Sequence, residues 1–229
     1  SGLSLDQAER VEGWRRRADA LVAAERDAAR ERASARLPDY LSVTGLGRLA
    51  RDPEVYAAEL RRPMPRLVSE AQRWGIGFHQ WLEHRFRDQS PLLDDEPEAE
   101  LAGAEFERLQ QGFVASPYAA AVPIAVEAPF TLVLGGRLVR GRIDAVFEAG
   151  DGRPQVVDWK TGDARRADPL QLACYRLAWA ELNGLAVHEV DAVFYDLHTA
   201  EIVRPASLPD RPGLEAVLAR LPGSVSLTS

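Results

Sequence analysis

Residues 141–175 decide the fold: they hold Gly-Arg-Ile-Asp-Ala-Val at 141–146, Val-Val-Asp-Trp-Lys-Thr-Gly at 156–162 and Gln-Leu-Ala-Cys-Tyr at 171–175. The middle run is apolar at its start and is stopped by a turn signal, so it predicts a short buried strand. A second strand is expected over 137–148. The Asp151-Gly152 turn folds that strand back beside the next one.

This fold-back predicts a cluster of charged side chains. Because side chains alternate across a strand, Asp158 and Lys160 project from one face, about 6–7 Å apart. The hairpin can bring Asp144 next to them. Mg²⁺ typically takes one or two protein carboxylates plus phosphate oxygens and waters. A lysine beside such a metal can orient its water and offset charge that develops on phosphorus, so the pattern indicates metal-assisted attack on a phosphoryl group.

The lysine is unusual in this chain. The sequence has 28 lysine and arginine residues, and Lys160 is the only lysine. If any cation sufficed at this position, arginine would be the expected residue, whereas a lysine offers a compact point charge. The alternative interpretation of an isolated Asp-x-Lys is an exposed ion pair. The turn, Asp144 and the following helix favour a site.

At these positions the chain resembles a known family. The segments Gly141 to Asp144, Val157 to Gly162 and Gln171 to Tyr175 are similar to the RecB-type nuclease domain of the PD-(D/E)XK superfamily. The resemblance covers roughly residues 42 to 200, with the family's Pro-Asp replaced by Ile143-Asp144. Residues 42–46 and 51–53 also resemble actinobacterial UvrD-type, AdnB-like helicase–nucleases, in which this domain is the C-terminal part of a motor chain.

The resemblance implies a fold class and a domain organisation. The expected fold is α/β, with a restriction-endonuclease-like core in which helices flank a central mixed sheet. A helical N-terminal region is added to this core. We expect a connector helix within residues 1–36 and the nuclease domain at 37–229, with its core at 42–204 and a C-terminal extension at 205–229.

The resemblance also implies a metal site. Asp144 and Asp158 would hold Mg²⁺ or Mn²⁺, with the Trp159 carbonyl and His79 completing the protein ligands. A lone histidine on a helix is more often structural than a ligand, but the Gly-x-Phe-His context of His79 matches the family motif. The other histidines have no such context and are expected to be surface or packing residues: His84, His188 and His198.

The family pattern gives roles to further side chains. Lys160 would position the nucleophilic water, while Gln171 and Tyr175, at i and i+4 on one helix face, would orient substrate or Lys160. A half-buried tyrosine at a helix edge is the alternative for Tyr175. Glu127 is placed equally well near the site or on the surface of a strand edge. Four basic residues are candidate phosphate contacts: Arg140, Arg142, Arg165 and Arg166.

Composition sets limits on the class of protein. Of the 229 residues, 46% are apolar and 28% charged, as in ordinary soluble globular proteins. We find no apolar run of membrane-spanning length and no signal peptide. The single cysteine, Cys174, excludes an intramolecular disulfide and the four-cysteine iron–sulfur cluster of some relatives. A cytoplasmic, nucleoid-associated protein that does not bind membranes is expected.

The charge of the chain suggests how it meets DNA. The net charge is −7 and the sequence pI is near 5.2, whereas free-standing DNA-binding domains usually carry a basic excess. An acidic nuclease would hold DNA weakly by itself. We therefore expect single-stranded DNA to be delivered by a helicase motor, present in the same chain or as a partner subunit.

The remaining patterns predict the other elements. Helices are expected at about 4–35, 44–51, 53–60, 69–87, 98–115, 170–183 and 213–221, and further strands at 124–134, 190–197 and 201–203. The glycines in the 69–87 helix predict close approach of another backbone, and residues 61–65 and 90–100 are read as a linker and an acidic loop.

The function expected is therefore that of a metal-dependent deoxyribonuclease in double-strand-break end processing and recombinational repair. A free-standing repair exonuclease is a second enzymatic interpretation. A non-catalytic relative that guides DNA or docks a partner subunit is the alternative from another class. Such relatives typically lose one of the two aspartates or the lysine, and all three are present here.

Overall fold

The computed structural model describes residues 40–61, 69–87 and 103–220, together with a few helical positions between 14 and 23. The expected connector helix, linker and acidic loop lie largely outside these residues. The described part is a mixed α/β fold with a six-stranded sheet flanked by helices, which confirms the predicted fold class. In chain order the elements are β1 (Tyr40–Ser42), α2 (Val43–Arg51), α3 (Pro53–Arg61), α4 (Glu70–Arg87), α5 (Ala104–Val114), β2 (Ala125–Leu134), β3 (Arg137–Glu148), β4 (Pro154–Lys160), η2 (Ala164–Arg166), α6 (Pro169–Leu182), η3 (Val187–Glu189), β5 (Asp191–Asp196), β6 (Glu201–Val203) and α7 (Arg211–Leu218).

The long strand β3 is the centre of the sheet. One of its edges pairs with β2 over nearly its whole length. Its other edge is shared: β1 runs parallel to residues 138–140, and β4 runs antiparallel to residues 145–148. Residues 141–144 lie between these two partners. The sheet is therefore split at this edge of β3, and β4 continues outward to β5 and β6.

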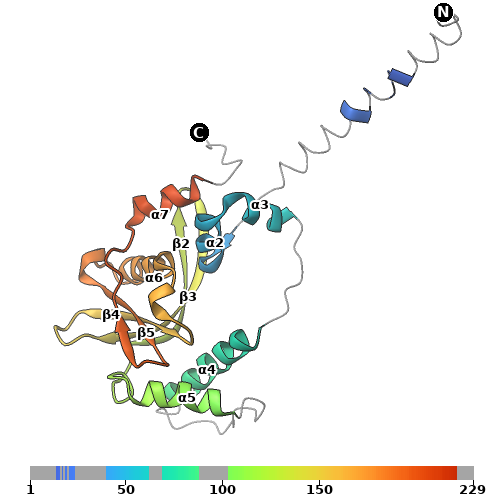
Figure 1. Ribbon diagram of the computed structural model, residues 1–229. Coiled ribbons are helices and arrows are strands. Elements are labelled where there is room, and N and C mark those ends of the chain that lie inside the picture. The colour runs from blue at the N-terminus through green and yellow to red at the C-terminus, as the bar shows by residue number, and fades with distance from the viewer. Residues whose placement is uncertain are drawn as a thin grey trace, which may run out of the picture.

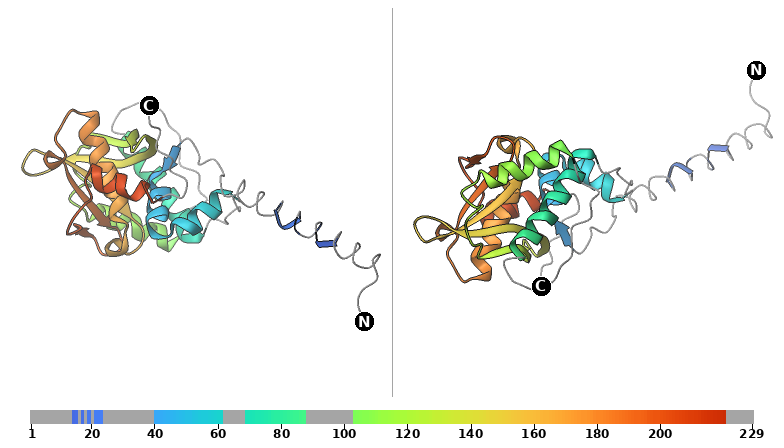
Figure 2. Two further views of the ribbon diagram at one scale, coloured as in Figure 1. Left: turned by 90° about the horizontal axis from the view of Figure 1, so that it is seen from above. Right: turned by 90° about the horizontal axis from the view of Figure 1, so that it is seen from below.

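Helices cover the sheet from two sides (Figure 1). One core lies between the sheet and α2, α6 and α7, and it contains Phe130, Val139 and Ile143 of the strands. The other core lies under α4 and α5 and contains Phe147 and Trp159. The views from above and below show the two groups of helices on opposite sides of the sheet (Figure 2).

Helix α6 begins where the sequence predicts, and most of its surface is buried. Asp168 caps it by accepting the Leu170 N–H, Pro169 occupies its first turn, and Gly184 follows it with a φ of 64°. Residues on most sides of the helix are buried, including Tyr175 and Trp179. The reason is that α6 is enclosed by the sheet, α2, α7 and η3.

Local turn chemistry places the hairpins correctly. Gly135 and Gly136 have φ of 53° and 73° between β2 and β3, and Gly152 has a φ of 80° between β3 and β4.

Strand β1 was not predicted. Helix α7 begins before the expected position 213, because Asp210 accepts the Gly213 N–H as its N-cap.

The expectation for the glycines of α4 is wrong at Gly75. A Cβ there would meet the Thr161 hydroxyl rather than another backbone. Close backbone approach occurs instead at Gly112 of α5, where an added Cβ would collide with the Leu197 carbonyl oxygen. No helix in the described part of the chain is both long and apolar enough to cross a bilayer.

Candidate active site

The candidate site begins at a distortion shared by β2 and β3. The antiparallel register is the same on both sides, with Val126 opposite Ala145 and Ala128 opposite Ile143. Between these pairs, Glu127 has a φ of 49°, in the region that non-glycine residues rarely adopt. Strand β3 also breaks its alternation here. Ile143 packs in the core under α6, whereas Ala145, two residues later, packs in the core under α4 on the opposite face of the sheet. Glu127 and Asp144 therefore leave the regular ladder together.

Asp144 stands at the point where β4 separates from β3. The last ladder pair between these strands is Ala145 with Val157. Beyond it, the Trp159 N–H donates to the Oδ2 of Asp144 at 3.0 Å. A buried backbone donor needs an acceptor, and here a carboxylate supplies it. This bond holds Asp144 beside the end of β4 that carries Asp158.

Lys160 is held from two directions. Its Nζ lies 2.5 Å from the Oδ2 of Asp158, as expected for residues i and i+2 on one strand face. It also donates to the Oε1 of Gln171 at 2.9 Å, and the Nε2 of Gln171 donates to the Tyr175 hydroxyl at 2.9 Å. These contacts confirm the prediction that Gln171 and Tyr175 share a helix face beside Lys160.

His79 enters from α4 on the other side of the sheet. Its Nδ1 lies 3.3 Å from the Oε1 of Glu127, and its Nε2 lies 3.9 Å from the Oδ2 of Asp144. Ligand atoms of these three residues all lie within 4.8 Å of one another. Of the two positions that the sequence left open for Glu127, the structure has the one beside the site.

The acids of the site repel one another, and this repulsion together with burial shifts the pKa values of the neighbouring groups. Burial, and then the neighbouring Asp158 carboxylate, raise the pKa of Asp144 well above its usual range. Burial alone would lower the pKa of His79, but the carboxylates of Asp144, Glu127 and Asp158 outweigh it and raise that pKa to about 9. Burial and the same acids raise the pKa of Tyr175.

This donor set suits a hard divalent cation. The Oδ2 of Asp158 is fully buried and accepts no hydrogen bond, although it faces the Lys160 ammonium. This oxygen is thus paired with one ammonium but has no well-aligned hydrogen bond, and a buried carboxylate oxygen is stabilised further when it gains another cationic partner. Glu127 and Asp144 offer ligand atoms within 4.8 Å of His79, and Asp158 adds a carboxylate beside Asp144. Carboxylate oxygens are the ligands that Mg²⁺ and Mn²⁺ prefer. His79, Glu127 and Asp144 could thus hold one cation, with Asp158 next to it.

The four candidate arginines fall into two pairs. Arg142 lies with its Nη1 3.7 Å from the Oε2 of Glu127, and Arg140 lies over the ring of Tyr40 with its Cζ 4.7 Å from the centroid. Both are on β3, but only Arg142 contacts one of the acids. The second pair is on η2, where Arg165 pairs with Glu201 at 2.6 Å and Arg166 with Asp163 at 3.3 Å.

One buried acid that the sequence analysis missed supports the loop after Lys160. Asp196 accepts the Ala164 N–H through Oδ2 and the His198 and Thr199 N–H groups through Oδ1, each at 3.0 Å. Burial would raise the pKa of Asp196, but these backbone donors hold it below its usual value. The available signal was an aspartate at the end of a strand before His-Thr, which is typical of a side-chain-capped turn.

Comparisons with known proteins complete the description. The family model of the PD-(D/E)XK nuclease superfamily matches residues 40–222. The crystal structure of a Eubacterium rectale protein named "Putative exonuclease" superposes with a TM-score of 0.53 at 16% sequence identity, over 81% of this chain and 78% of that chain. The structure of SSO0001 aligns over 84% of this chain and 82% of that chain at 14% identity, with a TM-score of 0.36. No curated protein matches the chain.

Proposed function

The chain belongs to the PD-(D/E)XK nuclease superfamily, and we propose that it is a divalent-metal-dependent deoxyribonuclease that hydrolyses phosphodiester bonds. One observation carries this proposal. At the split edge of β3, Asp144 is fixed beside the end of β4 by the Trp159 N–H, and Lys160 lies 2.5 Å from Asp158. Two acids and the only lysine of the chain thus lie together, and His79 approaches Asp144 from α4.

The residues have distinct roles in this proposal. Asp144, Asp158, His79 and the Trp159 carbonyl hold Mg²⁺ or Mn²⁺, and Glu127 contributes through His79 or directly. When bound, the metal polarises a phosphoryl oxygen and lowers the pKa of a bound water.

Lys160 acts next to this metal site. Its ammonium orients the attacking water and offsets the negative charge that develops on the phosphoryl oxygens. Gln171 holds this ammonium at 2.9 Å, and Tyr175 in turn fixes the amide of Gln171. Side chains of α6 therefore position the Lys160 ammonium and, through it, the attacking water. The burial of α6 makes it a rigid support.

We further propose that the substrate is single-stranded DNA delivered by a helicase motor, in double-strand-break end processing and recombinational repair. The net charge of −7 supports delivery, since an acidic domain gains little affinity from phosphate neutralisation alone. The resemblance of residues 42–46 and 51–53 to helicase–nucleases supports the same context. Mg²⁺ or Mn²⁺ is the metal proposed.

The test is cleavage of end-labelled DNA by the parent and by Asp158→Ala, with Mg²⁺ or Mn²⁺ added after chelation. We expect the parent to cut single strands faster than a duplex of the same sequence, and Asp158→Ala to lose cleavage. Asp151→Ala is the matched control, because Asp151 is an exposed aspartate at the other end of the β3–β4 hairpin. Equal cleavage by the parent and Asp158→Ala would end the proposal.

A further inference from the structure

Part of one sheet face is left open by the described helices. In β2, Phe130, Leu132 and Leu134 are buried in the core under α6. The alternate residues Pro129, Thr131 and Val133 are exposed on the opposite face. The core under α4 and α5 contains residues of β3, β4 and β5 from Ala145 onward, and none of β1 or β2. Among the described residues, α4 and α5 therefore cover only half of this face.

Basic and aromatic side chains occupy the open half. Val139 and Ile143 of β3 point into the core under α6, so Arg140 and Arg142 project from the open face by alternation. Beside them, the buried Leu41 of β1 leaves Tyr40 on the open face, where it is 50% exposed under the Arg140 guanidinium. We call Tyr40, Thr131, Val133, Arg140 and Arg142 the platform; it includes two arginines and no acid.

The platform leads into the candidate active site. Arg142 lies two residues before Asp144 on β3, and its Nη1 is 3.7 Å from the Oε2 of Glu127. Arg142 also belongs to a hollow beside α4 that His79 lines together with Gln72, Ile76 and Gln80. One surface thus runs from Tyr40 past both arginines to the acids.

We propose that the platform binds the single-stranded DNA segment that flanks the scissile phosphate, with Tyr40 stacking on a base and Arg140 and Arg142 contacting successive phosphates. This inference rests on the proposed function. Arginines at i and i+2 stand about 7 Å apart, and single-strand binding sites combine such cations with stacking rings. A chain with a net charge of −7 needs a local positive surface to accept DNA.

Binding in the absence of metal tests the platform without requiring cleavage. We would titrate a fluorescent single-stranded oligonucleotide with the protein in EDTA and follow anisotropy at several salt concentrations. Tyr40→Ala should weaken binding about tenfold, which is within the range for loss of one stacked base. Tyr40→Phe keeps the ring and should bind like the parent. Arg140→Gln should make the slope of log affinity against log salt shallower by about 0.7.

The control is Arg153→Gln, which removes the same charge from an exposed arginine that is paired with Asp151 at the β3–β4 turn, away from the platform. It should leave both affinity and salt slope unchanged. If Arg153→Gln weakens binding as much as Arg140→Gln, the attraction is diffuse and the platform is rejected. Tighter binding of duplex than of single strand would also overturn the assignment.

Cleavage assays separate this inference from the proposed function. With metal present, Tyr40→Ala should raise KM for single strands and leave kcat near that of the parent. A parent that cleaves normally, with Tyr40→Ala unchanged in both affinity and KM, would reject the platform alone. A parent that does not cleave, yet binds single strands in a Tyr40-dependent way, would reject the nuclease proposal and leave the platform standing.

Discussion

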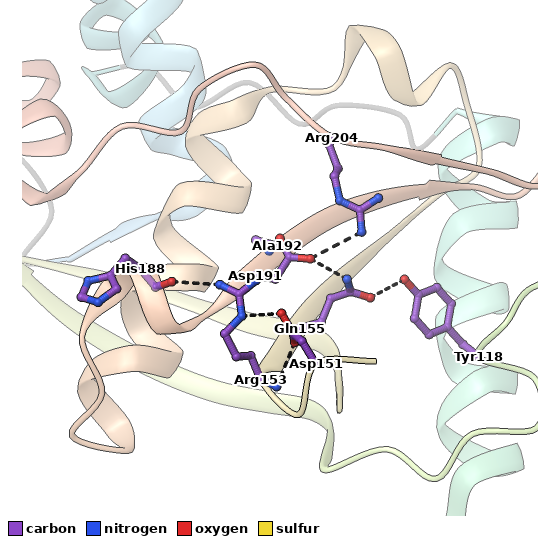
Figure 3. Close-up of polar contacts among 8 residues, drawn as sticks. All are labelled: Tyr118, Asp151, Arg153, Gln155, His188, Asp191, Ala192 and Arg204. Carbon is purple, nitrogen blue, oxygen red and sulfur yellow. Dashed lines mark hydrogen bonds and ion pairs between the residues drawn. The ribbon is translucent and has the colours of Figure 1, made fainter. Parts of the chain in front are cut away.

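The two ends of strand β4 carry polar groups that are treated in opposite ways. Near its start, Gln155 belongs to a network in which the polar atoms have partners (Figure 3). Tyr118 donates to Gln155 Oε1 at 2.6 Å, and Gln155 Nε2 donates to Asp191 Oδ2 at 2.6 Å. The same oxygen lies 3.5 Å from Arg204. This end ties the segment after α5 to the sheet through Tyr118, and its one buried amide has a partner at both of its polar atoms.

At its other end, β4 carries Asp158, whose carboxylate is close enough to Asp144 for the two acids to repel each other. Asp158 has a buried oxygen without a hydrogen bond, and its charge raises the pKa of Asp144. The Lys160 ammonium, the Trp159 N–H and His79 offset part of this concentration of negative charge. Buried polar groups cost stability when they are incompletely paired, so natural chains retain them mainly where they have a use. We therefore expect function at the Lys160 end of β4 and stability at the Gln155 end.

The largest expected effect comes from removing a charge at the Lys160 end. Asp144→Asn keeps an oxygen for the Trp159 N–H but removes one of the crowded carboxylates. We expect metal-dependent cleavage to fall by roughly a thousandfold or more. The melting temperature of the metal-free protein should hold or rise, because a carboxylate disfavoured by burial and by Asp158 is gone. The measurements are single-strand cleavage and thermal unfolding in EDTA.

The matched substitution at the other end is Asp191→Asn, which keeps an oxygen for the Gln155 amide. It should leave cleavage within about twofold of the parent. Comparable losses of cleavage from Asp144→Asn and Asp191→Asn would mean that the two ends do not differ in function.

The identity of the cation at position 160 gives the next largest effect. Lys160→Arg keeps the charge and the fold, but a planar guanidinium does not fit between the Asp158 oxygen and the Gln171 amide as a compact ammonium does. Cleavage should fall about a hundredfold at unchanged melting temperature. Turnover near that of the parent would show that any positive charge suffices, and Lys160→Met would then measure how much of the rate that charge supplies.

The Gln155 end should respond in stability alone. Tyr118→Phe leaves the buried Oε1 of Gln155 without its donor, which costs about 1–3 kcal/mol of unfolding free energy. For a domain of this size each kcal/mol lowers the melting temperature by about 2–4 °C. Cleavage at 25 °C should match the parent. Loss of cleavage at a temperature where Tyr118→Phe is still folded would show that this network also positions the site.

Sequence patterns of short range predicted most of the site's geometry. Asp158 and Lys160 share a face because strand side chains alternate, and Gln171 meets Tyr175 because helix residues i and i+4 are neighbours. The β3–β4 hairpin followed from Asp151-Gly152. The catalytic and metal-binding roles of these residues remain predictions, as do the domain boundaries.

Features that depend on tertiary structure could not be predicted in this way. Glu127 reaches the site through a positive φ that no local pattern signals. Strand β1 is three residues long and forms only because the edge of β3 is open beside β4. The platform has the same origin, since the exposure of Tyr40 and Arg140 depends on where α4 and α5 stop covering the sheet. Such features follow from packing, which spacing in the sequence does not encode.

The smallest expected effect is a pH dependence of stability that belongs to the Lys160 end. The pKa of His79 is raised from 6.5 in the unfolded chain to about 9 in the fold. Protonated His79 therefore contributes stability that is fully present below pH 6.5 and is lost as pH rises through about 9. The raised pKa of Asp144 acts with the same sign, because its stabilising form is the protonated one. The melting temperature in EDTA should thus fall by a few degrees between pH 6.5 and 9.5.

Three variants and one cation decide whether this slope comes from the site. His79→Gln should flatten it, whereas His198→Gln removes an imidazole that contacts the Thr161 carbonyl and Glu105, outside the group of His79, Glu127 and Asp144, and should retain it. Tyr118→Phe should also retain it, because burial raises the pKa of Tyr118 to about 12, outside this range. Saturating Mn²⁺ should flatten the slope in the parent, since a cation that replaces the proton between His79 and Asp144 stabilises the fold most where that proton is absent. A slope of equal size in His79→Gln would place its origin elsewhere and remove the electrostatic distinction between the two ends of β4.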